Sequence, residues 1–199
     1  MDESNKTRER ILDAALHLVR TRGYHLTTMD EIADGAGVSK GALYWHYRSK
    51  KDLFLHLIDY WVERIAGEIR SATEGEDRPD EILHRLCDTF ITQFARHPDV
   101  FEAETEFWAL AHRDPEAREK VHKVYGEFFH LIEKTMERGV QEGSFVLEDS
   151  HLAALTLLIN LESCVWFTLF SPDGVDYGTY LTYFQKHFIS SLGRERRQT

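Results

Sequence analysis

The chain has 199 residues, 42% of them hydrophobic, and a formal net charge of −10 at neutral pH. This length suits one or two small domains, and the apolar content favours a packed core over a disordered chain. The first ten residues are charged and lack the apolar segment of a signal peptide, so we expect a cytoplasmic protein. Two cysteines, Cys87 and Cys164, exclude a disulfide framework, and their apolar helical surroundings predict buried, reduced thiols.

The first predicted helix covers residues 6–22, where apolar side chains recur on one face and Gly23 follows. A second, short helix is expected after Thr28. Thr28 and Glu31 have the spacing of a capping box, in which each side chain accepts a hydrogen bond from a backbone amide at the helix start. This spacing predicts where the second helix begins.

A third helix is expected close behind the second. Gly35 and Gly37 allow a sharp turn because glycine adopts positive φ easily. Ser39 is a suitable N-cap for a helix over residues 40–47. Two short helices joined by a glycine turn are typical of the helix-turn-helix, whose second helix enters the major groove of DNA.

The third predicted helix has the side chains that contact DNA. Lys40 lies beside Gly41 and Ala42, and such small residues let a helix N-terminus approach base edges closely. The aromatic and basic residues that follow are Tyr44, Trp45, His46, Tyr47, Arg48, Lys50 and Lys51. This mixture suits contacts to phosphates. An ordinary three-helix core is the alternative, and it explains Leu43 and Tyr47, but it would also require the burial of Trp45.

Charge is distributed unevenly along the chain. Residues 1–51 carry nine Lys and Arg against seven Asp and Glu, whereas residues 52–199 carry fifteen against 27. An acidic protein can bind DNA where its local field is positive. Phosphates would repel the acidic part, so the N-terminal head is the surface expected to dock.

The remainder of the chain is helical in pattern, without strand alternation. We expect helices over residues 50–70, 79–96, 99–112, 115–143, 152–170 and 177–192. The first of these is unbroken, so it must carry the chain from the head into a larger domain. The predicted fold class is all-α, with a DNA-binding domain over residues 1–50 and a second domain over residues 51–199.

Residues 152–170 are apolar enough to suggest a membrane helix. Asn160 and Glu162 lie at the centre, where a carboxylate would be costly in lipid, so we expect a buried helix and no membrane contact. This helix and the last one are expected to form a four-helix interface between two copies. The residues expected in that interface are Leu155, Leu181, Phe184 and Phe188.

Residues 8–57 resemble the TetR family of transcriptional regulators, most densely in GVSKGALYWHYRSKKDLF, residues 37–54. The resemblance implies a head that reads a DNA operator and a helical C-terminal domain that binds a small molecule and dimerises. By position, Lys40, Gly41, Ala42 and Tyr44 would face bases, Thr28, Trp45, His46 and Lys50 would face phosphates, and Ser39 would cap their helix. Met29 is a departure, because some members have a base-reading arginine there and methionine cannot make that contact.

These features predict a ligand-responsive regulator, most simply a repressor that binds a palindromic double-stranded operator as a homodimer and is released by a small hydrophobic effector. A regulator controlled by a protein partner, one with no small-molecule ligand, and an activator are the alternatives. We find no nucleophile elbow, phosphate loop, metal-ligand spacing or acid–base pair, so neither an enzyme nor a cofactor is expected.

The effector site is expected among aromatic residues of the C-terminal part, together with two carboxylates. The candidates are Phe90, Phe94, Phe101, Glu104, Trp108, Tyr125, Phe128, Glu162 and Trp166. Glu104 lies in an apolar stripe, so it needs either an internal partner such as His130 or a ligand. A lipophilic cation would suit carboxylates among aromatic rings. A neutral or acidic lipid, with His112 or His130 as donor, is the alternative.

Overall fold

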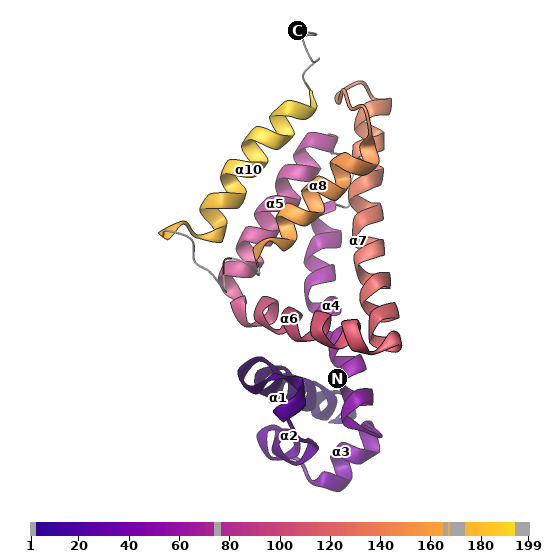
Figure 1. The fold of residues 1–199 in the computed structure, drawn as a ribbon, viewed down its shortest axis with the longest axis vertical. Helices are drawn as coiled ribbons and strands as arrows, with labels where there is room; N and C mark the ends of the chain where they lie inside the picture. The colour runs from indigo at the N-terminus through magenta and orange to yellow at the C-terminus, as the bar shows by residue number, and fades with distance from the viewer. Residues whose placement is uncertain (1–2, 74–76, 165–166, 168–173, 194–199) are drawn as a thin grey trace. The chain divides into compact units, whose positions relative to one another are not determined.

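The computed structural model describes residues 3–73, 77–164, 167 and 174–193, which form nine α-helices and no strand. This confirms the all-α class. Figure 1 shows the helices α1 (Glu3–Leu26), α2 (Met29–Ala36), α3 (Lys40–His46), α4 (Lys50–Thr73), α5 (Pro79–Arg96), α6 (Pro98–Arg113), α7 (Pro115–Gln141), α8 (Ser150–Glu162) and α10 (Tyr177–Leu192). None of the described helices combines the length and the apolar character that crossing a membrane requires.

The helices group into two compact units. The first comprises residues 1–64 and 99–123, and the second comprises residues 65–98 and 124–199. This grouping differs from a division at residue 50, because α6 packs with the head. Phe54 and Trp61 of α4 meet Phe107 of α6 edge to face, with ring centroids 5.3 and 5.6 Å apart. A separate functional domain over residues 1–50 stays a prediction.

The first helix extends beyond its predicted end. Gly23 has a φ of 77°, and the helix bends there and continues to Leu26. The buried Thr27 hydroxyl donates to the Gly23 carbonyl over 2.9 Å, which satisfies an acceptor that the bend leaves without its helical partner. The glycine therefore marks a bend rather than the end of α1.

In the second unit, α10 packs on α5 and α8 (Figure 1). Tyr177, at the start of α10, is buried; its hydroxyl donates to the Leu161 carbonyl of α8 over 2.7 Å, and its ring meets Phe94 of α5 edge-on at 4.8 Å. Helix α8 ends at Glu162, so it is shorter than the helix expected over residues 152–170. Residues 165–166 and 168–170 of that prediction lie outside the described part of the chain.

Both cysteines are buried thiols, as the sequence predicts. Cys87 lies on the inner face of α5, and burial raises the pKa of its thiol to about 12. A thiol with such a pKa stays protonated at neutral pH and reacts slowly.

Candidate nucleic-acid interface

The start of α2 is fixed by the predicted capping box. The Thr28 hydroxyl accepts the Glu31 N–H at 3.2 Å, and Glu31 Oε2 accepts the Thr28 N–H at 3.0 Å. The Thr28 hydroxyl also donates to Glu31 Oε2 at 2.8 Å, and the hydrogen bonds that this carboxylate accepts from the Thr28 hydroxyl and amide hold the pKa of Glu31 below its ordinary value. Thr28 is exposed, so its helix end faces solvent.

The turn between α2 and α3 depends on Gly37, whose φ of 62° lies in the left-handed region. Arg10 of α1 donates through Nη2 to the carbonyls of Ala36 and Gly37, which are the orphan acceptors at the end of α2. A Cβ on Gly37 would lie 2.9 Å from that same nitrogen. The turn is therefore set by both backbone conformation and a specific contact.

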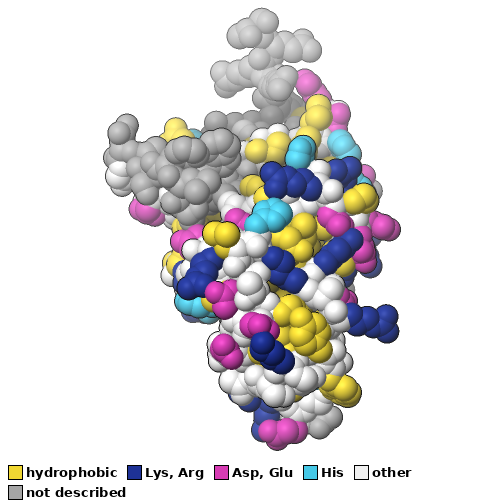
Figure 2. All heavy atoms as spheres, turned by 60° about the horizontal axis from the view of Figure 1, so that its bottom comes forward, with side chains coloured by type: hydrophobic (Ala, Val, Ile, Leu, Met, Phe, Trp, Pro, Cys, Tyr) yellow, Lys and Arg dark blue, Asp and Glu magenta, His cyan; other side chains and the backbone are white. Residues whose placement is uncertain are grey.

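Helix α3 is anchored on one side and open on the other. Ser39 caps it by accepting the Ala42 N–H at 3.1 Å. Leu43 is buried, whereas Tyr44 and Trp45 are 51% and 76% exposed. Helix α3 is thus held by its cap and by the buried Leu43, and its exposed residues include Lys40, Gly41 and Trp45. Figure 2 shows basic, acidic and apolar side chains interspersed over the visible face rather than one basic patch.

Lys50, for which a phosphate contact is expected, contacts backbone carbonyls of its own chain in the structure. Its Nζ donates to the carbonyls of Tyr24, His25 and Thr27, at 2.9, 3.2 and 2.9 Å, and lies 4.6 Å from the centroid of the Tyr24 ring. An ammonium has three donors, so these contacts engage all of them. Lys50 therefore fixes the segment between α1 and α2. Met29 is buried as well, at 9% exposure.

Helix α6 is tied to the same segment within the first unit. Glu106 Oε2 accepts the Tyr24 N–H at 2.9 Å, and Arg113 Nη1 lies 3.2 Å from His25 Nε2. Arg20 of α1 also pairs with Glu102 of α6 at 3.4 Å, and Lys51 of α4 pairs with Asp114, the residue between α6 and α7, at 2.7 Å. Sequence reasoning missed these contacts, because nothing in the spacing of residues joins a helix near position 106 to one near position 24.

The predicted effector residues divide between the two units. Phe101, Glu104 and Trp108 lie on α6 in the first unit, and Glu104 is buried at 1% exposure. Phe90, Phe94, Tyr125, Phe128 and Glu162 lie in the second unit, and Trp166 lies outside the described residues. Three of the candidates therefore belong to the first unit and five to the second.

Within the second unit, several of these residues touch. Phe90 of α5 stacks on Phe128 of α7 with centroids 5.4 Å apart. The Tyr125 hydroxyl donates to Glu162 Oε2 at 3.3 Å. His130, the internal partner considered for Glu104, instead contacts Glu133 at 3.2 Å.

The expected interface between copies needs one correction. Leu181 is fully buried, because the face of α10 that carries Tyr177, Leu181 and Ile189 packs into its own chain. Leu155 is exposed, and Phe184 and Phe188 are half-buried. Sequence reasoning missed three exposed residues, which are Leu152 and Ile159 of α8 and Tyr183 of α10. The spacing of Leu152, Leu155 and Ile159 along one helix face could have shown the first two.

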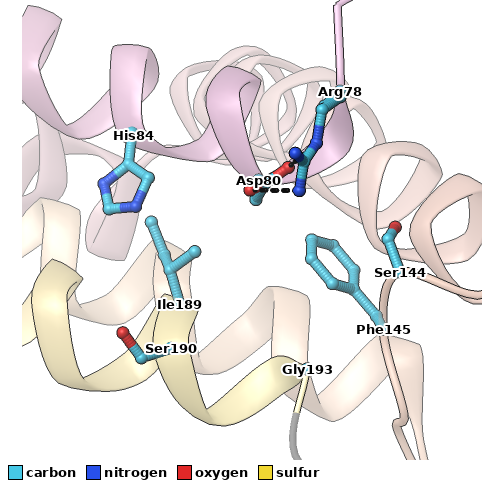
Figure 3. A pocket seen from close by; sticks show the side chains of 8 residues that line it. All are labelled: Arg78, Asp80, His84, Ser144, Phe145, Ile189, Ser190 and Gly193. Atoms are coloured by element: carbon cyan, nitrogen blue, oxygen red, sulfur yellow. Dashed lines mark hydrogen bonds and ion pairs between the residues drawn. The ribbon is translucent and has the colours of Figure 1, made fainter.

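A hollow of about 260 Å³ lies in the second unit, between the start of α5, the segment after α7 and the end of α10 (Figure 3). Arg78 and Asp80, paired at 3.1 Å, face it together with Phe145 and Ile189. Among the residues that the structure describes, none of the effector candidates lines this hollow.

Comparisons with known proteins agree with this arrangement. Residues 11–57 match the family model "Bacterial regulatory proteins, tetR family", and residues 76–175 match "Tetracyclin repressor-like, C-terminal domain". Over 100 residues the chain is 50% identical to the HTH-type transcriptional regulator AcrR of Shigella flexneri, a match that covers 47% of this chain and 46% of AcrR. The match thus spans under half the length of that relative.

Two solved structures share the fold. A putative transcriptional regulator from Saccharomonospora viridis, in complex with choline, has a TM-score of 0.81 and 23% identity, covering 92% of this chain and 97% of that one. FadR from Bacillus subtilis, in complex with stearoyl-CoA, has a TM-score of 0.74 and 19% identity, covering 92% and 98%. The fold and the matches are those of bacterial regulatory proteins with a helix-turn-helix head. The chain belongs to the TetR family.

Proposed function

We propose that this chain is a repressor that binds a palindromic operator as a dimer and is released by a small hydrophobic effector. The observation that carries the proposal is the open face of α3, where Lys40, Tyr44 and Trp45 reach solvent while Leu43 anchors the helix. A short helix held in this way can place its side chains in the major groove without reorganising.

Dimerisation follows from the apolar faces of α8 and α10. Leu152, Leu155 and Ile159 form an exposed stripe along α8, and Tyr183 is exposed on α10. A two-fold interface through these helices would place two α3 helices on one DNA duplex, at half-sites about 34–36 Å apart or a multiple of that distance. The two-fold symmetry of the dimer would then match a palindrome.

Helix α6 offers a route by which an effector would act. It carries Phe101, Glu104 and Trp108, and its Glu106 bonds to the Tyr24 amide beside the start of α2. An effector that displaces α6 would strain this contact and shift the head. It releases DNA only if it binds the DNA-incompetent state more tightly than the competent one.

The chemistry of the effector is proposed from the candidate residues. Glu104 is buried on α6, within one helical turn of Phe101 and Trp108 in sequence, and Glu162 accepts a hydrogen bond from the Tyr125 hydroxyl. Carboxylates near aromatic rings suit a lipophilic cation held over a ring face. The choline complex of the Saccharomonospora viridis regulator is in keeping with a quaternary ammonium, whereas the stearoyl-CoA complex of FadR favours an acyl ligand. These two classes are the ligands to compare.

Fluorescence anisotropy tests the proposal. An operator is first selected from random duplexes, and the complex is then titrated with a lipophilic quaternary ammonium and with stearoyl-CoA. We expect the cation to release wild-type protein and to act more weakly on Glu104→Gln and Glu162→Gln. Release by stearoyl-CoA alone would overturn the cation assignment, and failure to select any sequence would contradict operator binding itself.

A further inference from the structure

The first residue of α3 is joined to the first turn of α2 by an ion pair. Lys40 Nζ donates to Asp30 Oδ2 over 2.6 Å, and the two side chains are 64% and 56% exposed. Exposed pairs of this kind contribute little to stability. Asp30 also lies in the first turn of α2, where a carboxylate interacts favourably with the helix N-terminus, but this contribution does not require the pair with Lys40.

For general DNA affinity, this carboxylate is unfavourable. Asp30 lies two residues after Thr28, which is the N-cap of α2 and is expected to contact a phosphate. If Lys40 leaves Asp30 to reach a phosphate, an unpaired anion remains beside the negative backbone. The pair thus opposes binding to DNA that offers Asp30 no hydrogen-bond donor.

A G·C pair offers partners to both groups, with both of its acceptors on one base. In the major groove, guanine presents N7 and O6 as acceptors, and the cytosine paired with it presents the N4 amino group as a donor. Lysine to guanine and aspartate to cytosine N4 are favoured pairings. Guanine O6 and cytosine N4 are neighbours across the pair, as the ammonium and carboxylate are neighbours here. An A·T pair also offers a donor, the adenine amino group, but this group lies between its two acceptors, so Lys40 would reach only one acceptor there rather than the two of guanine.

We propose that Asp30 and Lys40 act as one unit that reads a single G·C pair in each half-site, with Lys40 on guanine and Asp30 on cytosine. This inference rests on the proposed operator binding. It gives α2 a base contact at the residue next to Met29, whose own side chain is buried. It also makes Asp30 a specificity-determining residue rather than a residue that strengthens binding to all DNA.

Selection from a random duplex library tests the unit, with wild type, Asp30→Asn and Lys40→Gln as full-length proteins. We expect both variants to lose preference at the same G·C position, by roughly tenfold, while the remainder of the motif stays. Asp30→Asn should also bind random duplexes more tightly than wild type does, because a negative charge is gone.

Asp34→Asn is the matched control. Asp34 lies one turn further along α2 and acts on Lys40 only through its charge, with no hydrogen bond between the two among the described contacts. This variant loses the same negative charge but keeps the contact between Asp30 and Lys40. It should therefore keep the G·C preference. Thermal unfolding of each variant shows that the head remains folded.

Three results separate the possibilities. If Asp30→Asn keeps the G·C preference, or if it and Lys40→Gln relax different positions, the inference is wrong while operator binding stands. If Asp34→Asn relaxes the same position equally, net charge rather than the contact is responsible, and the unit is again refuted. If wild type selects no motif, the proposed function itself fails.

Discussion

Arg48 and Lys50 lie two residues apart in the head, and the structure gives them different surroundings. Arg48 is exposed, whereas the Lys50 ammonium donates to three carbonyls between α1 and α2. Sequence alone presents both as cations in a basic run. Only the folded chain shows which of them is engaged internally, because the carbonyls come from residues more than twenty positions away.

We predict that Lys50→Ala destabilises the head, whereas Arg48→Ala weakens DNA binding. The lysine variant should lower the free energy of unfolding by about 1–3 kcal/mol, since charge-assisted hydrogen bonds and their acceptors are lost. The arginine variant should reduce the steepness with which the DNA association constant falls with salt, by about one in a plot of log K against log salt, because one phosphate contact is lost. Urea unfolding and salt titrations measure the two effects. An unchanged stability for Lys50→Ala would contradict the structural role.

The capping box at the start of α2 predicts that the stability of the fold depends on pH. The pKa of Glu31 is lowered because its ionised carboxylate accepts hydrogen bonds from Thr28. Ionised Glu31 therefore stabilises the fold above the ordinary glutamate value of 4.5, and this contribution is lost as the pH falls through the lower folded-state pKa. Glu31→Gln should lower the melting temperature at pH 7, and the difference between the two proteins should be smaller at pH 3. A constant difference at both pH values would exclude the charge as the cause.

At the scale of helices, the starts were predictable because capping is local. Thr28, Ser39 and Pro79 lie where the sequence indicates, and the structure shows α2, α3 and α5 beginning there. The face that each helix turns toward the core was less predictable. Leu181 was expected on an outer face, but α10 turns that residue toward α5, and a helix that is apolar on several sides does not reveal which side faces inward.

Two glycines of α7 give a matched test of packing. A Cβ on Gly139 would lie 2.0 Å from Phe145 Cδ2, and the backbone amides of Ser144 and Phe145 both donate to the Gly139 carbonyl. Gly126 has no atom within 4 Å of its Cβ position. Gly139→Ala should therefore cost about 1–3 kcal/mol through overpacking. Gly126→Ala should stabilise by about 0.5–1 kcal/mol through helix propensity. Denaturant unfolding compares them, and equal effects would contradict the packing of Phe145.

For the whole molecule, the feature that sequence reasoning did not foresee was the place of α6 in the unit that contains the head. Hydrophobic periodicity predicts each helix separately, but α6 joins the head through Glu106 and Phe107, which meet residues of α1 and α4 far away in sequence. The candidate effector residues consequently divide between the units. This division means that Glu104 and Glu162 have to be tested by separate variants.

The last prediction concerns assembly through α8 and α10. Ile159 is 60% exposed on α8, in line with Leu152 and Leu155. Ile159→Glu would place a charge in the proposed interface, where an unpaired carboxylate is strongly disfavoured, so the variant should be a monomer with weakened operator binding. Val140→Glu is the control, because Val140 is an exposed apolar residue of α7 outside that stripe and should leave the dimer intact. Analytical ultracentrifugation at micromolar concentration measures both. A monomeric wild type would refute the interface, and so would an Ile159→Glu dimer as stable as that of Val140→Glu.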